Sequence, residues 1–201
     1  WMFGRDLVNW NNNFTWAKWV TPSRDLISAF KQEGDEVRFK ESIVYYDCNW
    51  SNYYPSDNYP FMYKCRSANS SIIKYRYADV LLLKAEALIM QDTPDLEGAA
   101  DIIDEVRDRA KLGALPTSVR SNKNVLLNAL LKERRLELAF EGQRWFDLVR
   151  LDKVEEVMNA VYSKDSGRKA QIYTFDKNSY RLPIPQSVID ANDKIHQNPG
   201  Y

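Results

Sequence analysis

Histidine and cysteine are scarce in this chain, and its charges balance. His196 is the single histidine, so a metal site built from several histidines is excluded, and a Ser-His-Asp triad would depend on that one residue. Lys and Arg together number 28, as do Asp and Glu, which leaves no electrostatic footprint for nucleic acid or an anionic membrane surface. Cys48 and Cys65 form no CxxC pattern that would indicate zinc or thioredoxin-like chemistry. The residues alone leave two readings of this pair open, a disulfide of an exported protein or two free thiols.

Long apolar runs are also lacking. No stretch of 18 apolar residues occurs, so the sequence predicts no membrane-spanning helix. Hydrophobic residues nevertheless make up 44% of the chain, which is enough for a core and argues against wholesale disorder. The chain starts at Trp1, with no Met and no charged-then-apolar leader before it. We therefore expect that a leader peptide or a larger N-terminal part is missing from this sequence.

Aromatic residues are concentrated in the first third of the chain. Residues 1–65 hold 16 of the 26 Phe, Trp and Tyr residues, and they are also rich in Asn, as in WNNNFTWAKW at 10–19. Such composition is typical of loops and turns. We interpret residues 1–71 as an aromatic and Asn-rich loop segment and residues 72–201 as a helical region.

Three local patterns stand out within the loop segment. SRDLISAF (23–30) predicts a short helix with Ser23 as its N-cap. VRFKESIVYYD (37–47) alternates loosely and predicts a strand or an extended piece. NWSNYYPSDNYPFMYK (49–64) is typical of a loop.

Helical signals dominate from residue 72 onward. IIKYRYADVLLLKAEALIM (72–90) is apolar nearly all round, which predicts a buried helix. DTPD (92–95) marks the start of a second helix, with Asp or Thr as the cap and Pro at the first position, and Gly113 marks its end. Helix pairs of this kind form tetratricopeptide-like hairpins. Two more helices are predicted at about 122–140 and 143–160, so the fold class is mainly α.

The segment ERRLELAFEGQRWFDLVR (133–150) mixes charged residues with a broad apolar face. Burying any of these charges alone would cost several kcal/mol. We therefore expect them to be paired at helical spacing, with a further partner supplied by another helix. Because every acid here has an arginine within reach, we interpret the network as structural, not catalytic. The expected ion-pair residues are Arg107, Arg134, Glu137, Glu141, Arg144 and Asp147, with Arg150 as a further partner of Asp147.

Five stretches of the chain carry a family resemblance: KYRYADVLLLKAEAL (74–88), DEVRDRAKL (104–112), ERRLELAFEGQRWFDLVR (133–150), LPIPQSVID (182–190) and QNPGY (197–201). Together they resemble the C-terminal half of the SusD/RagB family, the nutrient-binding outer-membrane lipoproteins of Bacteroidetes-type bacteria. The matches keep the family's order and extend over about 72–201. Family chains are roughly twice this length, so the resemblance implies that the N-terminal half of the full protein is missing.

The resemblance implies a SusD-like, mainly α fold of tetratricopeptide-like helical hairpins with long aromatic-rich loops. It implies a surface-exposed lipoprotein of the outer membrane that captures a glycan ligand for import through a SusC-like TonB-dependent transporter. No catalysis and no cofactor are implied, and the membrane is contacted only through an N-terminal lipid anchor that is not present in this chain. A peptide-binding member of the family, or a tetratricopeptide-type interaction scaffold without a small ligand, are the alternatives. An oxidising compartment also favours a disulfide between Cys48 and Cys65.

A glycan site is expected among the loop aromatics, because sugars have apolar ring faces and polar rims that suit aromatic and amide side chains. Loop aromatics also commonly anchor loops onto a scaffold, which is the competing interpretation for each of them. A solvent-facing turn at 55–58 favours the Tyr-rich loop. The predicted ligand-binding residues are Trp10, Trp16, Trp19, Trp50, Tyr53, Tyr54 and Tyr59.

Overall fold

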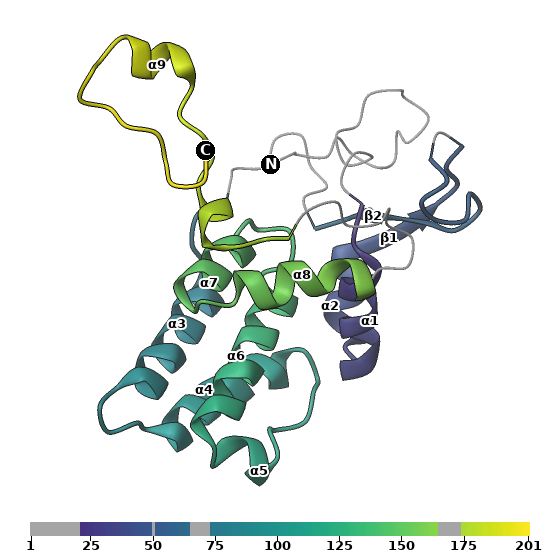
Figure 1. Ribbon diagram of the computed structural model, residues 1–201. Coiled ribbons are helices and arrows are strands. Elements are labelled where there is room, and N and C mark those ends of the chain that lie inside the picture. Colours follow the sequence, from purple (N-terminus) through teal and green to yellow (C-terminus); the bar gives the residue numbers. More distant parts are fainter. Residues whose placement is uncertain (1–20, 50, 65–72, 165–173) are drawn as a thin grey trace. The chain divides into compact units, whose positions relative to one another are not determined.

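The computed structural model describes residues 21–49, 51–64, 73–164 and 174–201 (Figure 1). Two compact units make up the chain, Trp1–Arg144 and Trp145–Tyr201. The boundary therefore follows Arg144, whereas the amino-acid composition changes at residue 72. Helices dominate the described residues, and the predicted mainly α fold class is confirmed.

Helices and one small sheet form the described part of the first unit. Its elements are α1 (Arg24–Glu33), α2 (Glu36–Ser42), β1 (Ile43–Tyr46), β2 (Tyr59–Met62), α3 (Tyr77–Met90), α4 (Leu96–Arg109), α5 (Thr117–Arg120) and α6 (Lys123–Glu137). The helix α7 (Arg144–Arg150) begins at the last residue of this unit. The second unit continues with α8 (Val154–Lys164), the 3-10 helix η3 (Lys177–Tyr180) and α9 (Gln186–Asp190).

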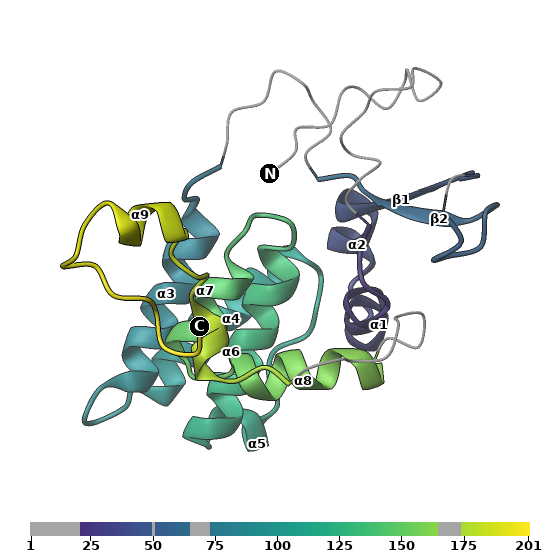
Figure 2. The same cartoon turned by 45° about the horizontal axis from the view of Figure 1, so that its top comes forward.

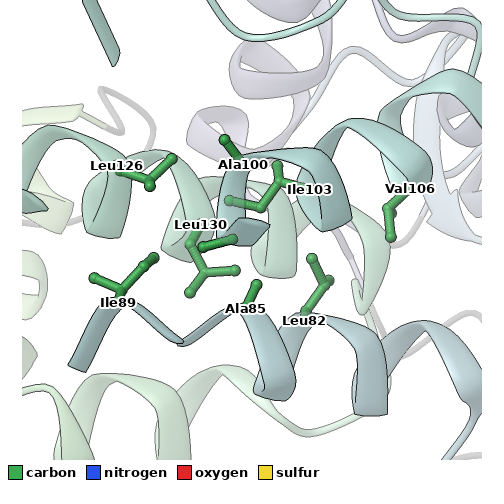
Figure 3. Close-up of a cluster of buried hydrophobic side chains, with 9 residues drawn as sticks. Leu82, Ala85, Ile89, Ala100, Ile103, Val106, Leu126 and Leu130 are labelled. Atoms are coloured by element: carbon green, nitrogen blue, oxygen red, sulfur yellow. The ribbon is translucent and has the colours of Figure 1, made fainter. Parts of the chain in front are cut away.

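The main core of the first unit lies between α3, α4 and α6 (Figure 3). A short connection joins α3 to α4, as the predicted helical hairpin requires. Side chains of α3 point toward those of α4 and α6, and alanines in the crossing allow the helices to approach closely. The buried residues of this core are Leu82, Ala85, Ile89, Ala99, Ala100, Ile103, Val106, Leu126 and Leu130.

One face of α3 departs from the prediction that 72–90 is a wholly buried helix. Tyr77 is 72% exposed, Val80 53% and Met90 54%. In the described part of the chain, α3 packs mainly against α4 and α6. Its buried residues lie on the face toward these two helices.

Helix boundaries shift where a side chain or a backbone angle decides them. The cap of α4 is Asp95, whose carboxylate accepts a hydrogen bond from the Gly98 amide at 2.9 Å, so the helix starts later than predicted. It ends before Gly113, since Lys111 already has a φ of 60°. The helix predicted at 143–160 is two helices, broken where Asp152 has a φ of 52°.

The segment 37–47, predicted to be extended, is half helix and half strand. Asp35 caps α2 by accepting a hydrogen bond from the Arg38 amide at 3.1 Å, which starts a helix where alternation suggested a strand. The strand β1 follows and pairs antiparallel with β2, with Ile43 opposite Met62. Figure 2 shows this hairpin beside α1 and α2. The predicted loop 49–64 therefore ends in a strand.

The helix α1 forms as predicted at its start. The Ser23 hydroxyl accepts a hydrogen bond from the Leu26 amide at 3.1 Å, which confirms Ser23 as the N-cap. At the other end, Gly34 has a φ of 67°, a conformation that favours glycine.

In the second unit, the LPIPQ stretch (182–186) and the QNPGY stretch (197–201) are joined by side-chain hydrogen bonds. The side-chain amide of Gln197 accepts from the Ile184 amide at 2.8 Å and donates to the Ile184 carbonyl at 2.9 Å. Asn198 donates to the Leu182 carbonyl at 2.7 Å. Side chains of the QNPGY stretch thereby satisfy backbone groups of the proline-containing LPIPQ stretch, as a neighbouring strand would do.

A network of buried ion pairs surrounds the C-terminal turn of α6. Glu133 and Glu137 are each 2% exposed, and the Arg38 guanidinium of α2 reaches both, at 2.6 and 3.1 Å. Arg38 also contacts Asp35 at 2.5 Å. These contacts join α2 to α6 across more than 90 residues of sequence.

A second arm of the network lies before α3. The Arg76 guanidinium contacts Glu137 at 2.5 Å and Glu141 at 2.7 Å. Lys64, just after β2, contacts Glu141 at 2.5 Å and donates to the Glu137 carbonyl at 2.6 Å. Arg109 of α4 also pairs with Glu137. Carboxylates of the 133–150 segment therefore bind cations from four other places in the chain.

The remaining predicted ion-pair residues find partners both inside and outside their own segment. Arg134, 2% exposed, pairs with Asp79 of α3 at 2.9 Å, a partner that helical spacing did not indicate. Asp147 pairs with Arg150 at 2.7 Å, the spacing that the sequence predicted. Arg107 contacts Glu33 at 2.9 Å and Glu133 at 3.3 Å. The Arg144 guanidinium donates to the Leu131 carbonyl at 3.1 Å.

Burial and neighbouring cations shift the pKa values of these carboxyl groups in opposite directions. Burial raises the pKa of Glu133 against the opposing charges of Arg38 and Arg107. For Glu137 burial also acts upward, but the hydrogen bonds and charges of Arg76 and Arg109 outweigh it and lower the pKa to about 2. Glu137 is therefore ionised at neutral pH and central to the network.

Removing Asp79 should destabilise the protein strongly. The change Asp79→Ala removes the carboxylate that lies 2.9 Å from the buried Arg134 guanidinium, which should lower the free energy of unfolding by about 3 to 5 kcal/mol. The matched control is Glu36→Gln, which removes a carboxylate from the exposed Lys40–Glu36 pair and should cost less than about 1 kcal/mol. Urea unfolding measures both, and equal losses would contradict a role for burial.

Glu137 should make stability depend on pH in the acid range. Its pKa in the folded state, about 2, lies below its ordinary value of 4.5, so its stabilisation is complete above about pH 4.5 and is lost as the pH falls toward 2. The shift corresponds to at most about 3 kcal/mol. Unfolding free energies measured from pH 6 to 2.5 should fall less steeply in Glu137→Gln than in the unsubstituted protein, whatever the variant's stability at pH 7. Parallel curves would contradict this assignment.

Candidate functional site

The predicted ligand-binding aromatics fall into two groups. Trp10, Trp16, Trp19 and Trp50 lie outside the described residues, so their role stays a prediction. Tyr53 and Tyr54 lie in the described part of the loop between β1 and β2, and Tyr59 is the first residue of β2.

Backbone hydrogen bonds shape this loop. The Cys48 amide donates to the Ser56 carbonyl at 2.6 Å, and the Asn58 amide donates to the Pro55 carbonyl at 3.3 Å. The Ser51 hydroxyl accepts from the Tyr53 amide at 3.3 Å. The turn predicted at 55–58 forms and is exposed to solvent.

Tyr59 lies in the core and not on the accessible surface of the loop. It is 4% exposed and clusters with Cys48 and Phe61, and its hydroxyl is 2.9 Å from that of Ser51. It is the first residue of β2, lies opposite Tyr46 of β1, and belongs to a strand whose four residues are all buried. Its position does not support the predicted ligand contact, and its ring instead supports Tyr54, edge-on at a centroid distance of 5.5 Å.

Tyr53 and Tyr54 are half-buried, and Arg24 of α1 holds them. Their rings meet edge-on at a centroid distance of 4.9 Å. The Arg24 guanidinium lies over both rings, 4.2 Å from the centroid of Tyr53 and 4.4 Å from that of Tyr54, and it donates to the Tyr53 carbonyl. The Tyr54 hydroxyl donates to the Pro22 carbonyl at 2.9 Å. Two cation–π contacts and two hydrogen bonds thus tie the loop to the start of α1.

Sequence reasoning missed Arg24 as a member of this site. It lies 29 residues from Tyr53, and nothing in its local pattern distinguishes it from another arginine in the first turn of a helix. Arginine side chains often stack on tyrosine rings, which is the one signal the sequence offered. Using it requires knowing that the start of α1 meets the β1–β2 loop.

An open pocket of about 970 Å³ lies beside these residues. Its described lining combines two aromatic rings, two amides, two hydroxyls and one guanidinium. A pocket of this composition offers both flat apolar surface and hydrogen-bonding groups. The lining residues are Arg24, Cys48, Asn49, Ser51, Asn52, Tyr53, Tyr54, Pro55 and Ser56.

Within the described residues, Cys48 is a free thiol that is 2% exposed and packs against Tyr59 and Phe61 as a small apolar core residue. Its predicted partner, Cys65, lies outside the described residues. The disulfide therefore stays a prediction, while hydrogen bonds and the hydrophobic cluster shape the described part of the loop.

The described residues hold neither a metal-binding cluster nor a membrane-spanning helix. Over the described ranges, no three His, Cys, Asp or Glu side chains gather in a way that could hold a metal ion. None of the helices in the described part of the chain combines the length and the apolar character needed to cross a membrane.

Known proteins share both the sequence pattern and the fold. A sequence model described as the SusD family matches residues 56–201. The SusD-like protein P2 of Formosa agariphila is 36% identical over 143 residues, which are 68% of this chain and 27% of that protein. The curated relative is thus much longer than the part this chain matches.

Solved structures agree. A SusD superfamily protein from Bacteroides vulgatus superposes on 90% of this chain with a TM-score of 0.67 and 22% identity, and this chain covers 44% of it. A laminarin-binding SusD-like protein superposes on 100% of this chain with a TM-score of 0.58 and 25% identity, and 43% of it is covered. This chain therefore spans less than half the length of each solved relative. Because the family match extends over more than half of the chain and the fold agrees, this chain belongs to the SusD family.

Proposed function

We propose that this chain is part of a cell-surface protein that binds an oligosaccharide or polysaccharide and passes it on for import. Three observations support this. The chain belongs to the SusD family, a structural neighbour that covers the whole chain binds laminarin, and the pocket beside Tyr53 and Tyr54 has the chemistry that a sugar requires.

The pocket carries the proposal. Sugar hydroxyls both donate and accept hydrogen bonds, and the amides of Asn49 and Asn52 do the same. Ser51 and Ser56 add hydroxyls, and the tyrosine rings add apolar surface for C–H groups. An open pocket also suits a long chain, which can extend beyond it on either side. A glycan ligand therefore fits better than a compact metabolite.

The described lining favours binding over hydrolysis. Glycoside hydrolysis requires two carboxyl groups on opposite sides of the scissile bond. No carboxylate belongs to the lining within the described residues. The buried carboxylates of the α6 network are held by arginines and lysines, which suits a structural role. We propose that the ligand leaves chemically unchanged.

Delivery to a transporter completes the proposal. Family membership supports a surface-exposed lipoprotein of the outer membrane whose partner is a SusC-like TonB-dependent transporter. Co-purification of the full-length protein with such a transporter from outer membranes would test this partnership directly.

Native affinity electrophoresis of the full-length protein against a polysaccharide panel tests the ligand class. Laminarin, other neutral glucans and acidic polysaccharides should be included. We expect at least one polysaccharide to retard the protein. The chain length of that polysaccharide should stay unchanged. Cleavage would indicate a hydrolase, and retardation by none, together with binding of a peptide mixture, would favour the peptide-binding alternative.

Tyr53→Ala should weaken glycan binding. Loss of the ring removes a pocket wall and one cation–π contact of Arg24, so the dissociation constant should rise about 10-fold, equivalent to about 1.4 kcal/mol. The matched control is Tyr77→Ala on α3, whose ring is 72% exposed and outside the pocket. Isothermal titration with the polysaccharide from the panel measures both. Unchanged affinity in Tyr53→Ala, with binding of the parent intact, would place the site elsewhere.

A further inference from the structure

We propose that this pocket selects an anionic sugar residue, one bearing a uronate carboxylate or a sulfate ester, and that Arg24 is the residue that recognises its charge. This inference rests on the proposed glycan-binding function and specifies the class of glycan.

The charge of the pocket lining points to an anion. Arg24 carries a full positive charge, whatever else it contacts. The other described lining residues are Cys, Asn, Ser, Tyr and Pro, and none is acidic. Its sequence neighbour Asp25 faces away to Arg135, with the carboxylate 2.6 Å from that guanidinium. The described lining therefore has a net positive charge at neutral pH.

The stacking geometry points the same way. Neutral sugars bind tyrosines best when the face of the ring is open. Here the Arg24 guanidinium occupies one face of each ring, 4.2 Å from the centroid of Tyr53 and 4.4 Å from that of Tyr54. A ligand approaching that side meets a guanidinium and its N–H donors before it meets an aromatic face. Carboxylates and sulfates are the groups that such donors bind most strongly.

Arg24 is also held in position before a ligand arrives. It is half-buried at the first position of α1, its guanidinium lies on two rings, and it donates to the Tyr53 carbonyl. A fixed, partly desolvated guanidinium loses less side-chain freedom on binding than a mobile surface arginine. Partial burial also strengthens its attraction for an anion relative to that of a fully hydrated cation.

Matched polysaccharide pairs test the charge with the sugar backbone held constant. Polygalacturonate is compared with its fully methyl-esterified form, and dextran sulfate with dextran, by isothermal titration against the full-length protein. We expect at least one acidic polymer to bind about 10-fold or more tightly than its neutral partner, with an affinity that falls as salt is raised. A preference in the first pair identifies uronate, and a preference in the second identifies sulfate.

Two substitutions assign the preference to Arg24. In Arg24→Gln the ratio of acidic to neutral affinity should fall to about 1, and Arg24→Lys should retain part of it, because lysine keeps the charge but not the planar donors. The ratio of the two affinities is the readout, because a loosened loop would weaken the binding of both polymers alike. Lys40→Gln is the control: it removes the same charge from α2 at a side chain that is 72% exposed and outside the pocket.

Three results would overturn the inference: equal or tighter binding of the neutral partners, no binding of either acidic polymer, or a ratio unchanged in Arg24→Gln. If laminarin or another neutral glycan still binds, the proposed function stands and only the charge selectivity fails. If no polysaccharide binds at all, the proposed function fails with it.

Discussion

The described part of the first unit depends on the pairing of buried charges around the C-terminal turn of α6. Glu133, Arg134 and Glu137 are each 2% exposed, and a charge at such a position destabilises the fold unless a partner compensates it. Their partners come from segments that are distant in sequence, Arg38 on α2 and Arg76 before α3 among them. Each ion pair therefore also fixes how two segments pack, and the charges act as specific contacts within an otherwise apolar core.

Ion pairs also fix the position of α1, which carries Arg24 of the candidate site. Arg135 of α6 pairs with Asp25, next to Arg24, and Glu33 at the other end of α1 is held by Arg107 and Lys132. Apolar contacts between α1, α2 and the end of α6 add to these pairs. The first turn of α1 is thus positioned by the helical core, and Arg24 in turn carries the tyrosines of the β1–β2 loop. The helical scaffold and the β1–β2 loop therefore contact each other at Arg24.

Such an arrangement separates the helical core of the first unit from the loop that lines the candidate pocket. The α3, α4 and α6 core follows apolar periodicity, and the loop between β1 and β2 can change its side chains without disturbing that core. Tyr59 and Phe61 anchor the loop, which leaves Tyr53, Asn52 and Ser56 at the pocket. Members of one family can therefore keep the scaffold and still differ in ligand.

Local sequence patterns were enough to predict the helical hairpin, the N-cap at Ser23, the ion pair between Asp147 and Arg150, and the need of the 133–150 charges for partners. Spacing along a helix and the cost of a buried charge are local properties. Three features became visible only in the folded chain: Arg134 pairs with Asp79, Tyr59 is buried, and Arg24 lies over two tyrosine rings. Each of these depends on which distant segments pack together. Spacing along one segment carries no information about that, since many arginines could satisfy the same carboxylate or ring.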